Sequence, residues 1–164
     1  MKKAYFVIIR GPLGCGKSTI AERIAKIMNA EHIPIDRILD EHDLTTDKEQ
    51  GYISQKSFLK ANKIIIPTIK KQLKQGIPVI IDGNFYWKSQ IEDLIKRLDF
   101  QSYVFTLKAP LKLCIERDSK RKKSHGKYAA RAVYKKATEF NYGIIIDNRG
   151  TANETTKKIK SSLP

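Results

Sequence analysis

The sequence predicts an α/β protein in which a parallel sheet of five strands is sandwiched by helices. Three observations lead to this prediction. Apolar runs of strand length recur five times, segments with helical spacing separate them, and a glycine-rich stretch joins the first run to the first helical segment. Strands buried on both faces of a parallel sheet are continuously apolar, as these runs are. The length of 164 residues suits one domain with a single core, so we expect one domain over residues 1–164.

The expected strands are short runs rich in β-branched and aromatic residues. They cover residues 4–9, 32–36, 78–82, 103–107 and 143–147. The second run ends in an aspartate, Asp36, and the third ends in another, Asp82. Both aspartates should therefore lie at the carboxyl edge of the sheet.

The expected helices follow apolar residues at helical spacing. They cover residues 17–29, 53–75, 88–98, 111–139 and 153–162. Pro67 should start, kink or split the second of these helices, and a break near Ser124-His125-Gly126 should divide the fourth. Residues 40–52 are polar and acidic, and we expect a loop or a short irregular segment there.

The overall charge is strongly positive, with 32 Lys and Arg against 17 Asp and Glu, which gives +15. Such a balance predicts attraction to polyanions, and nucleic acid is the expected partner, although plain solubility would also explain it. No apolar run approaches the length of a membrane span, and the N-terminus lacks a signal-peptide pattern, so a cytoplasmic location is expected. Nothing in the sequence points to a protein partner.

The most informative stretch is Gly11-Pro12-Leu13-Gly14-Cys15-Gly16-Lys17-Ser18. It fits G-x-x-x-x-G-K-[ST], the Walker A phosphate-binding loop, and lies between an expected strand and an expected helix, as that loop requires. Its backbone N–H groups and the helix N-terminus would hold phosphates. Lys17 would reach the β- and γ-phosphates and the Ser18 hydroxyl would bind Mg²⁺, so ATP and Mg²⁺ are the expected cofactors.

Asp36 is the candidate general base. Ligands of parallel α/β sheets collect at the carboxyl ends of the strands, where a carboxylate can accept the proton of an attacking hydroxyl. The alternative is a helix N-cap, since Arg37-Ile38-Leu39 follows.

Asp82-Gly83-Asn84 is the candidate second half of the phosphate site. An apolar strand that ends in Asp commonly holds Mg²⁺ in phosphate-loop proteins, directly or through water, so Ser18 and Asp82 form the expected metal site. Asn84 is a candidate for acceptor binding, and a simple turn is the alternative for the whole tripeptide.

Arg117 and Arg121 lie four residues apart, and on a helix they share one face. Two guanidinium groups there could clamp the phosphates as a mobile lid over about residues 115–137, whereas a solvated basic helix is the alternative. The nucleotide-binding residues that we expect are Gly11, Gly14, Cys15, Gly16, Lys17, Ser18, Thr19, Arg117 and Arg121.

The remaining polar residues give weaker indications. Asn148-Arg149-Gly150-Thr151 should border the nucleotide base, and without an Asn-Lys-x-Asp signature ATP is favoured over GTP. His32, His42 and His125 have no metal-ligand spacing, so we expect structural or surface roles. Cys15 and Cys114 are expected to be ordinary thiols.

These motifs resemble the P-loop kinase superfamily, and within it the phage-type 5′-hydroxyl polynucleotide kinases. The resemblance rests on Gly11–Ser18, Asp36, Asp82-x-Asn84 and the lid run Arg117-Asp118-Ser119-Lys120-Arg121, with Tyr134-Lys135 following. It implies a nucleoside-kinase-like P-loop NTPase fold. In the active site it would make Asp36 the base, with Lys17, Arg121 and Arg117 stabilising the transferred phosphoryl. The arginine that the family often carries three residues beyond the base is Leu39 here, which leaves Arg37 as the nearest candidate for acceptor binding.

Three functions follow as hypotheses. The first is an ATP-dependent kinase that phosphorylates the 5′-OH end of RNA or DNA. The second is a kinase of the same type for a small acceptor, such as a nucleoside, nucleotide, sugar acid or antibiotic, since a fold does not determine its substrate. The third is a nucleic-acid-binding ATP switch, in which Asp36 and the two lid arginines would have no role.

Overall fold

The computed structural model describes residues 3–164, and in it five parallel strands form one sheet. Their order across the sheet is β2 (Glu31–Pro34), β5 (Val79–Gly83), β1 (Tyr5–Arg10), β6 (Gln101–Lys108) and β7 (Ile144–Asp147). Every neighbouring pair in this sheet is parallel. The predicted α/β class with a five-stranded parallel sheet is therefore confirmed.

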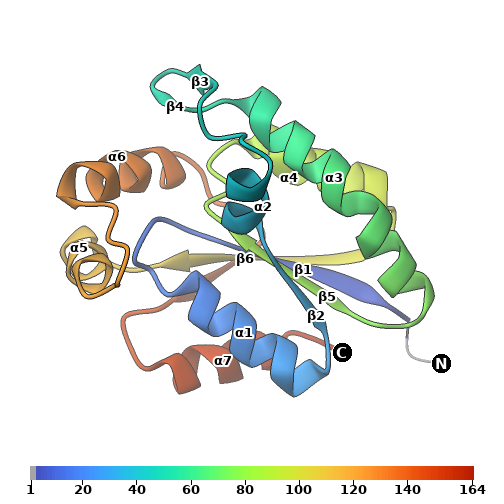
Figure 1. Cartoon of the computed structure of the whole chain (residues 1–164). Helices are drawn as coiled ribbons and strands as arrows, with labels where there is room; N and C mark the ends of the chain where they lie inside the picture. Colours follow the sequence, from blue (N-terminus) through green and yellow to red (C-terminus); the bar gives the residue numbers. More distant parts are fainter. Residues whose placement is uncertain (1–2) are drawn as a thin grey trace.

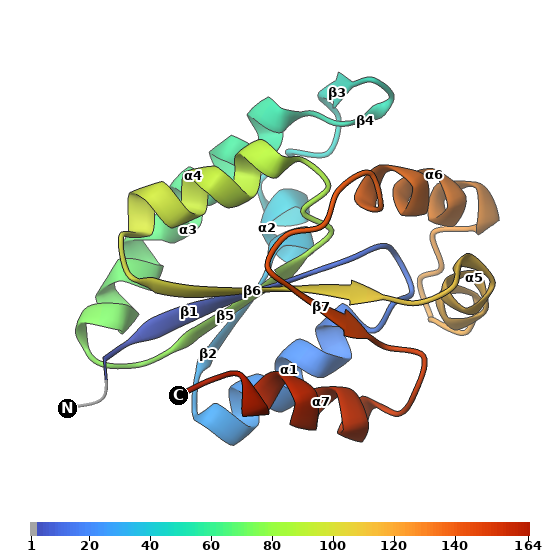
Figure 2. The same cartoon turned by 180° about the vertical axis from the view of Figure 1, so that it is seen from behind.

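Helices cover both faces of the sheet (Figure 1). On one face lie α1 (Lys17–Met28) and α7 (Ala152–Ser161), and on the other lie α2 (Ile35–Glu41), α3 (Gln55–Lys74) and α4 (Lys88–Leu98). Two further helices, α5 (Leu111–Ser119) and α6 (Lys127–Ala137), stand beyond the carboxyl end of the strands, as the view from behind also shows (Figure 2). They occupy the region in which the sequence predicts a lid, and we refer to them as the lid helices.

The central strand β1 organises both halves of the core. All six of its residues are buried, and alternate side chains enter opposite layers. Phe6 and Ile8 pack with α2, α3 and α4, whereas Val7 and Ile9 pack with α1 and α7. This is the burial expected of a strand in the middle of a parallel sheet. It fixes the position of the glycine-rich loop that follows at Gly11.

Two elements differ from the sequence prediction. The second strand ends at Pro34, and residues 35–41 form helix α2, so Asp36 lies in the first turn of a helix and does not close a strand. Within the expected loop, β3 (Lys48–Glu49) and β4 (Tyr52–Ile53) pair as an antiparallel hairpin. The physical reason is length: one helix of two turns and two strands of two residues are too short to show a hydrophobic period.

Helix α3 runs without interruption from Gln55 to Lys74, although Pro67 lies inside it. Ser54 caps its N-terminus by accepting a hydrogen bond from the Ser57 N–H group, at 3.1 Å. The expected start or split at Pro67 is wrong, because burial of one long face outweighs the single hydrogen bond that proline cannot donate. The expected break between the lid helices is confirmed, since no helix spans residues 120–126.

A fully buried arginine, Arg10, joins the sheet to the end of the lid. Its Nε donates to the Phe85 carbonyl at 3.2 Å, and its Nη2 donates to the Ala137 carbonyl at the end of α6 at 2.8 Å. Nη1 donates to Thr106 Oγ1 at 3.2 Å, and the guanidinium lies 4.3 Å from the centre of the Phe140 ring. Burial lowers the pKa of Arg10 to about 10, which leaves it charged at neutral pH.

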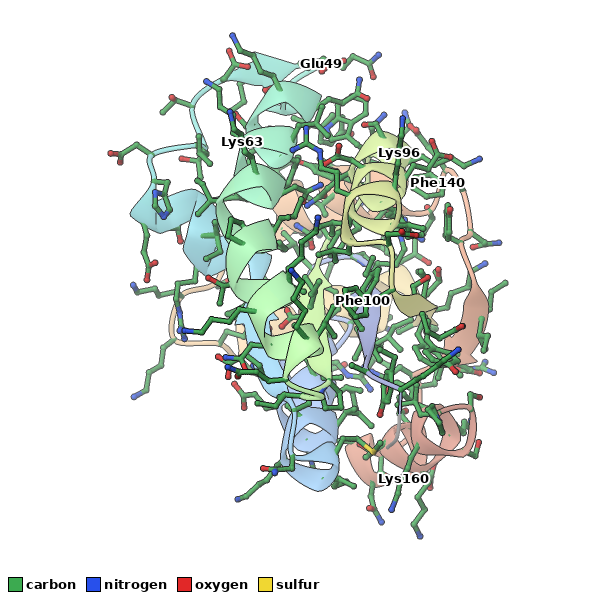
Figure 3. The ribbon with its side chains drawn as sticks, turned by 90° about the vertical axis from the view of Figure 1, so that its right-hand side faces the viewer. Glu49, Lys63, Lys96, Phe100, Phe140 and Lys160 are labelled. Atoms are coloured by element: carbon green, nitrogen blue, oxygen red, sulfur yellow. The ribbon has the colours of Figure 1, made fainter. Side chains whose placement is uncertain are left out.

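The excess of positive charge is spread over several faces of the molecule. Exposed Lys63 projects from α3, Lys96 from α4 and Lys160 from α7 (Figure 3). None of the helices in residues 3–164 has the length and the apolar character needed to cross a bilayer.

We predict that Arg10→Met lowers the free energy of unfolding by about 3 kcal/mol or more. The change leaves several buried carbonyls without a donor, and each such orphaned group costs roughly 1–3 kcal/mol. Urea denaturation at neutral pH measures the loss. The control is Arg97→Met, which breaks a half-exposed ion pair with Asp93 and should cost less than about 1 kcal/mol. Equal losses for the two variants would contradict the central role of Arg10.

Candidate active site

The glycine-rich loop Gly11–Ser18 lies between β1 and α1 and closes against the lid helix α5. Gly14 has φ +74°, and a Cβ atom there would lie 2.0 Å from the Cys114 carbonyl oxygen of α5. Gly16 has φ +93° and is the N-cap residue of α1. Glycine is therefore required at both positions, and the free N–H groups of the first turn of α1 face the anion-binding hollow that the sequence predicts.

Lys17 is almost buried, with 8% of its surface exposed. Its Nζ donates to the Pro12 carbonyl at 2.7 Å, so the side chain folds back over the loop. This carbonyl is a weak competitor for the ammonium group, because a phosphate would offer a full negative charge in the same place.

Asn148 holds the glycine-rich loop from the far side. Its Nδ2 donates to the Cys15 carbonyl, and its own N–H donates to the Lys108 carbonyl at 2.7 Å. The sequence predicts that Asn148 borders the nucleotide base, and it gives no sign of this contact with the loop. No local pattern reveals it, since the two partners are 133 residues apart.

The expected metal site is assembled from α1 and β5. Ser18 Oγ donates to Asp82 Oδ1 at 3.2 Å, and Asp82 is 4% exposed. Within residues 3–164, no three metal-ligating His, Cys, Asp or Glu side chains form a cluster. Two oxygen ligands from the protein fit Mg²⁺, which usually takes only one or two from protein and the rest from phosphates and water.

His32 is a neighbour of the expected metal site. Its Nε2 contacts Asp82 Oδ2, the carboxylate oxygen that does not face Ser18. This contact is a structural role of the kind expected for His32, in which the ring orients the carboxylate at the expected metal site.

Two cavities open along this edge of the sheet. The first has a volume of about 350 Å³ and lies over the glycine-rich loop. It is lined by Leu13, Gly14, Gly16, Lys17, Ser18, Thr19, Ile20, Asp36, Arg117, Arg121, Asn148, Gly150 and Ala152. The second is larger, about 660 Å³, and lies between α2, the β3–β4 hairpin and α6. Its lining is Leu13, Asp36, Leu39, Asp40, Thr45, Lys48, Gln50, Gly51, Tyr52, Ile53, Asn84, Tyr86, His125, Ala129, Ala132 and Val133.

Asp36 lines both cavities, and so does Leu13. The N-cap of α2 is Pro34, so the capping alternative for Asp36 is wrong. The side chain reaches solvent through the cavities, but the protein surrounds its carboxyl closely. This desolvation raises its pKa, Lys17 and His125 oppose the rise, and Asp82 adds to it. A carboxylate whose pKa is raised towards the working range and that borders two cavities suits a general base.

The two lid arginines reach the first cavity from α5 and the turn that follows it. Arg117 Nη1 donates to the Asn148 carbonyl at 2.9 Å, and Arg121 lies 3.9 Å from Asp118. Both arginines line one cavity together with Lys17. The expectation that they share a helix face is wrong, because α5 ends at Ser119 and Arg121, which is half exposed, lies in the turn beyond it.

Buried Asp118 organises the turn between the lid helices. It accepts hydrogen bonds from Ser124 Oγ at 3.0 Å and from the His125 N–H group at 3.1 Å. Burial would raise the pKa of Asp118, but the hydrogen bonds from His125 and Ser124 outweigh it and hold the pKa below its usual range. His125 also lines the second cavity, so it is more than a surface residue.

The two residues expected to bind the acceptor differ in outcome. Asn84 lines the second cavity, and its binding to the acceptor stays a prediction. Arg37 is exposed on α2 and is not part of the lining of either cavity, so the structure does not bring it to the site. Successive residues of a helix point about 100° apart, so Arg37 does not share the direction in which Asp36 meets the cavities.

Helix α6 and the β3–β4 hairpin are joined across the second cavity. Tyr52 Oη donates to the Ala132 carbonyl at 3.0 Å. Lys136 is buried, with its Nζ 3.9 Å from the centre of the Trp87 ring and 3.2 Å from Glu139 Oε2. These contacts hold the hairpin and the lid helix together as opposite walls of the cavity. The sequence gives no sign of them.

Comparison with known proteins gives one family match and several structural neighbours. A family model described as an AAA domain matches residues 6–140. No curated protein matches the chain. Among solved structures, a sugar kinase from Janibacter has 17% identity and a TM-score of 0.79, covering 99% of this chain and 95% of that one.

Two other solved structures are similarly close. A gluconokinase from Sinorhizobium meliloti has 14% identity and a TM-score of 0.75, covering 99% and 93% of the two chains. The Mycobacterium tuberculosis APS kinase, in complex with AMPPNP and APS, has 16% identity, a TM-score of 0.78 and 99% coverage of both chains. At this identity the likeness establishes the fold alone. None of the three is described as a polynucleotide kinase.

Gly14→Ala should reduce ATP affinity at least tenfold. The new Cβ atom overlaps the Cys114 carbonyl and pushes the loop away from α5. The matched control is Gly76→Ala, where φ is +80° and no atom lies within 4 Å of the added carbon. That variant carries only the left-handed backbone cost of about 1–2 kcal/mol and should bind ATP normally. Calorimetric titration with ATP measures the affinity of both variants. Equal ATP affinities for Gly14→Ala and Gly76→Ala would show that the loop relieves the clash without losing its phosphate-binding conformation.

Asp36→Asn should raise the melting temperature at neutral pH. A carboxyl whose pKa is raised on folding binds protons more tightly in the folded state, so stability falls as pH rises through that pKa. The gain should shrink as the pH falls through the raised pKa and then below the ordinary pKa of an aspartate, because the wild-type carboxyl becomes neutral like the amide. Asp43→Asn, outside both cavities, controls for the removal of one negative charge. A lower melting temperature for Asp36→Asn than for the wild type at pH 7 would contradict a raised pKa for Asp36.

Proposed function

This chain belongs to the AAA domain family, and from that membership and the geometry of the site we propose that it is an ATP-dependent kinase that phosphorylates a hydroxyl group of a small molecule. The observation that carries the proposal is the position of Asp36 where two cavities meet. One cavity has the glycine-rich loop, Lys17 and two arginines, which suit the phosphates of ATP. The other is a separate space for the acceptor.

The proposed reaction is a direct transfer between the two cavities. The acceptor oxygen attacks the γ-phosphorus of ATP, its proton passes to Asp36, and the bond between the γ-phosphorus and the bridging oxygen of ADP breaks. The backbone of Gly14 and Gly16 and the first turn of α1 hold the phosphates. Lys17 and the lid arginines stabilise the negative charge on the phosphoryl group as it moves.

Ser18 and Asp82 would hold Mg²⁺, and His32 keeps the Asp82 carboxylate in place. When bound, Mg²⁺ neutralises charge on the phosphates. The role of Asn148 is to keep the Cys15 carbonyl, and with it the loop, in the conformation that the phosphates require.

Small molecules are favoured over nucleic acid ends for two reasons. The structural neighbours include proteins described as a sugar kinase, a gluconokinase and an APS kinase. In addition, a polynucleotide site needs a groove of Lys and Arg along the phosphate backbone. Lys48 is the one lysine or arginine in the described lining of the second cavity.

A 5′-hydroxyl polynucleotide kinase is the second candidate. The observation in its favour is the exposed basic run of the lid, Lys120 to Lys127, on a chain of net charge +15. Such a surface could hold a nucleic acid strand beside the site. Turnover would then fall steeply with salt, because each neutralised phosphate releases bound counterions.

The test is transfer of the labelled γ-phosphate of ATP in the presence of Mg²⁺. One arm offers nucleosides, sugars and amino alcohols, and the other offers 5′-OH oligoribonucleotides and oligodeoxyribonucleotides. We expect transfer to small acceptors that depends little on salt. Salt-sensitive labelling of oligonucleotide ends alone would favour the second candidate, and ATP hydrolysis without any transfer would overturn both.

In the same assay, Asp36→Asn should lower kcat about 10²- to 10⁴-fold, the usual contribution of a general base. ATP affinity should change less than about threefold, because the phosphates are held by other groups. Wild-type kcat/KM should fall as pH drops through the raised pKa of Asp36, since only the ionised carboxylate accepts a proton. A variant that retains full activity would show that Asp36 is not the base.

A further inference from the structure

The wall of the second cavity carries more negative than positive charge, in contrast to the chain as a whole. We propose that the acceptor carries no negative charge and is a neutral or cationic molecule rich in hydrogen-bond donors, such as a nucleoside, a polyol or an amino alcohol. This inference rests on the proposed kinase function and narrows its substrate class. It excludes the nucleotides and sugar acids that the sequence leaves open.

The charges of the lining support this directly. Asp36 and Asp40 contribute two carboxylates from α2. Lys48 contributes one ammonium group from the hairpin, and His125 contributes an imidazole from the turn before α6. Because Asp36 must be ionised to act as a base, a carboxylate, sulfate or phosphate on the acceptor would meet like charge within the same cavity. An uncharged or cationic acceptor avoids that repulsion, and a cation gains attraction.

Positive groups near the cavity are already engaged elsewhere. Arg117 and Arg121 line the nucleotide cavity and belong to the phosphates of ATP. Lys136 approaches from α6, but its ammonium group is paired with Glu139, bonded to Gln50 and placed over the Trp87 ring. In the described lining of this cavity, the basic side chains are Lys48 and His125. His125 is engaged by Asp118, with its Nδ1 3.3 Å from Asp118 Oδ1, and the Lys48 side chain is exposed.

The hydrogen-bonding groups of the wall favour a ligand that donates. Carboxylates accept hydrogen bonds and do not donate. Asn84 also lines the cavity, and its side-chain oxygen is buried without a hydrogen-bond partner among residues 3–164. Buried oxygens of this kind are normally bonded, so a hydroxyl or amino group of the acceptor would supply the missing donor.

The aromatic residues of the wall suit the same class of ligand. The rings of Tyr52 and Tyr86 meet edge to face, with centroids 5.5 Å apart, and both line the cavity. Aromatic faces beside carboxylates attract ammonium groups and the C–H faces of sugar rings. The volume of about 660 Å³ has room for a nucleoside or a sugar.

The experiment uses sets of related acceptors whose members carry different charges. The sets are glucose, glucosamine, gluconate and glucose 6-phosphate; adenosine, 5′-amino-5′-deoxyadenosine and AMP; and glycerol, serinol and glycerate. Phosphoryl transfer from ATP with Mg²⁺ gives kcat/KM, and calorimetry gives binding in the presence of a non-hydrolysable ATP analogue. In every set that contains a phosphorylated acceptor, we expect kcat/KM for the neutral or cationic member to be at least tenfold higher than for its anionic counterpart.

A variant at Asp40 tests whether the cavity charge causes this preference. Asp40→Asn should reduce the discrimination against the anionic member about fivefold or more and leave ATP affinity unchanged. Asp43→Asn removes the same charge at an exposed residue that is not part of the lining and should leave the discrimination unchanged. If Asp40→Asn behaves like Asp43→Asn, the electrostatic origin is overturned.

The remaining outcomes distinguish a failure of this inference from a failure of the proposed kinase function. Preference for an anionic member would overturn the inference while the kinase activity stands. No transfer to any member, with ATP bound normally, would overturn the proposed small-molecule kinase and the inference with it. Unchanged binding of all acceptors by Asn84→Ala would overturn the part assigned to the Asn84 oxygen.

Discussion

One buried cation, Arg10, connects the central strand of the sheet to the β5–α4 connection and to the end of the lid helix α6. It stands at the end of β1, directly before the glycine-rich loop, and donates to carbonyls of the β5–α4 connection and of the end of α6. A buried charge without a carboxylate partner is tolerated only where dipoles replace water around it, and the carbonyls at the C-terminus of a helix provide such dipoles. The loop that would hold phosphates and the helix that walls the second cavity therefore take their positions from the same side chain.

Much of the fold follows from local patterns in the sequence. The apolar runs predict all five strands of the main sheet, and the glycine-rich motif predicts the strand–loop–helix unit, because both signals lie within a few residues. Asp36, Asp82 and Asn84 can be placed at the carboxyl edge of the sheet for the same reason. Helix α2 and the hairpin are too short for such signals. His32, Asn148 and Lys136 act through contacts with residues 50, 133 and 49 to 86 positions away, which no periodicity reports.

Net charge and local charge lead to different conclusions about this molecule. A value of +15 suggests a polyanion as partner, yet exposed lysines point outward from several faces (Figure 3), while two carboxylates line the second cavity. The lid run that gives the sequence its resemblance to polynucleotide kinases makes local contacts: Arg117 with Asn148, and Asp118 with the turn that follows it. Those contacts explain how the lid is built, and they carry no information about the acceptor.

The β3–β4 hairpin supplies one wall of the second cavity and contacts the lid through Tyr52 and Lys136, but it has no part in the lining of the nucleotide cavity. Acceptor recognition and nucleotide handling are thus carried by separate pieces of chain. Insertions, deletions or exchanges in residues 45–53 could alter what is phosphorylated while the phosphate-binding machinery stays intact. Mutations confined to this short surface hairpin, whether they arise in evolution or by engineering, can therefore change the acceptor specificity.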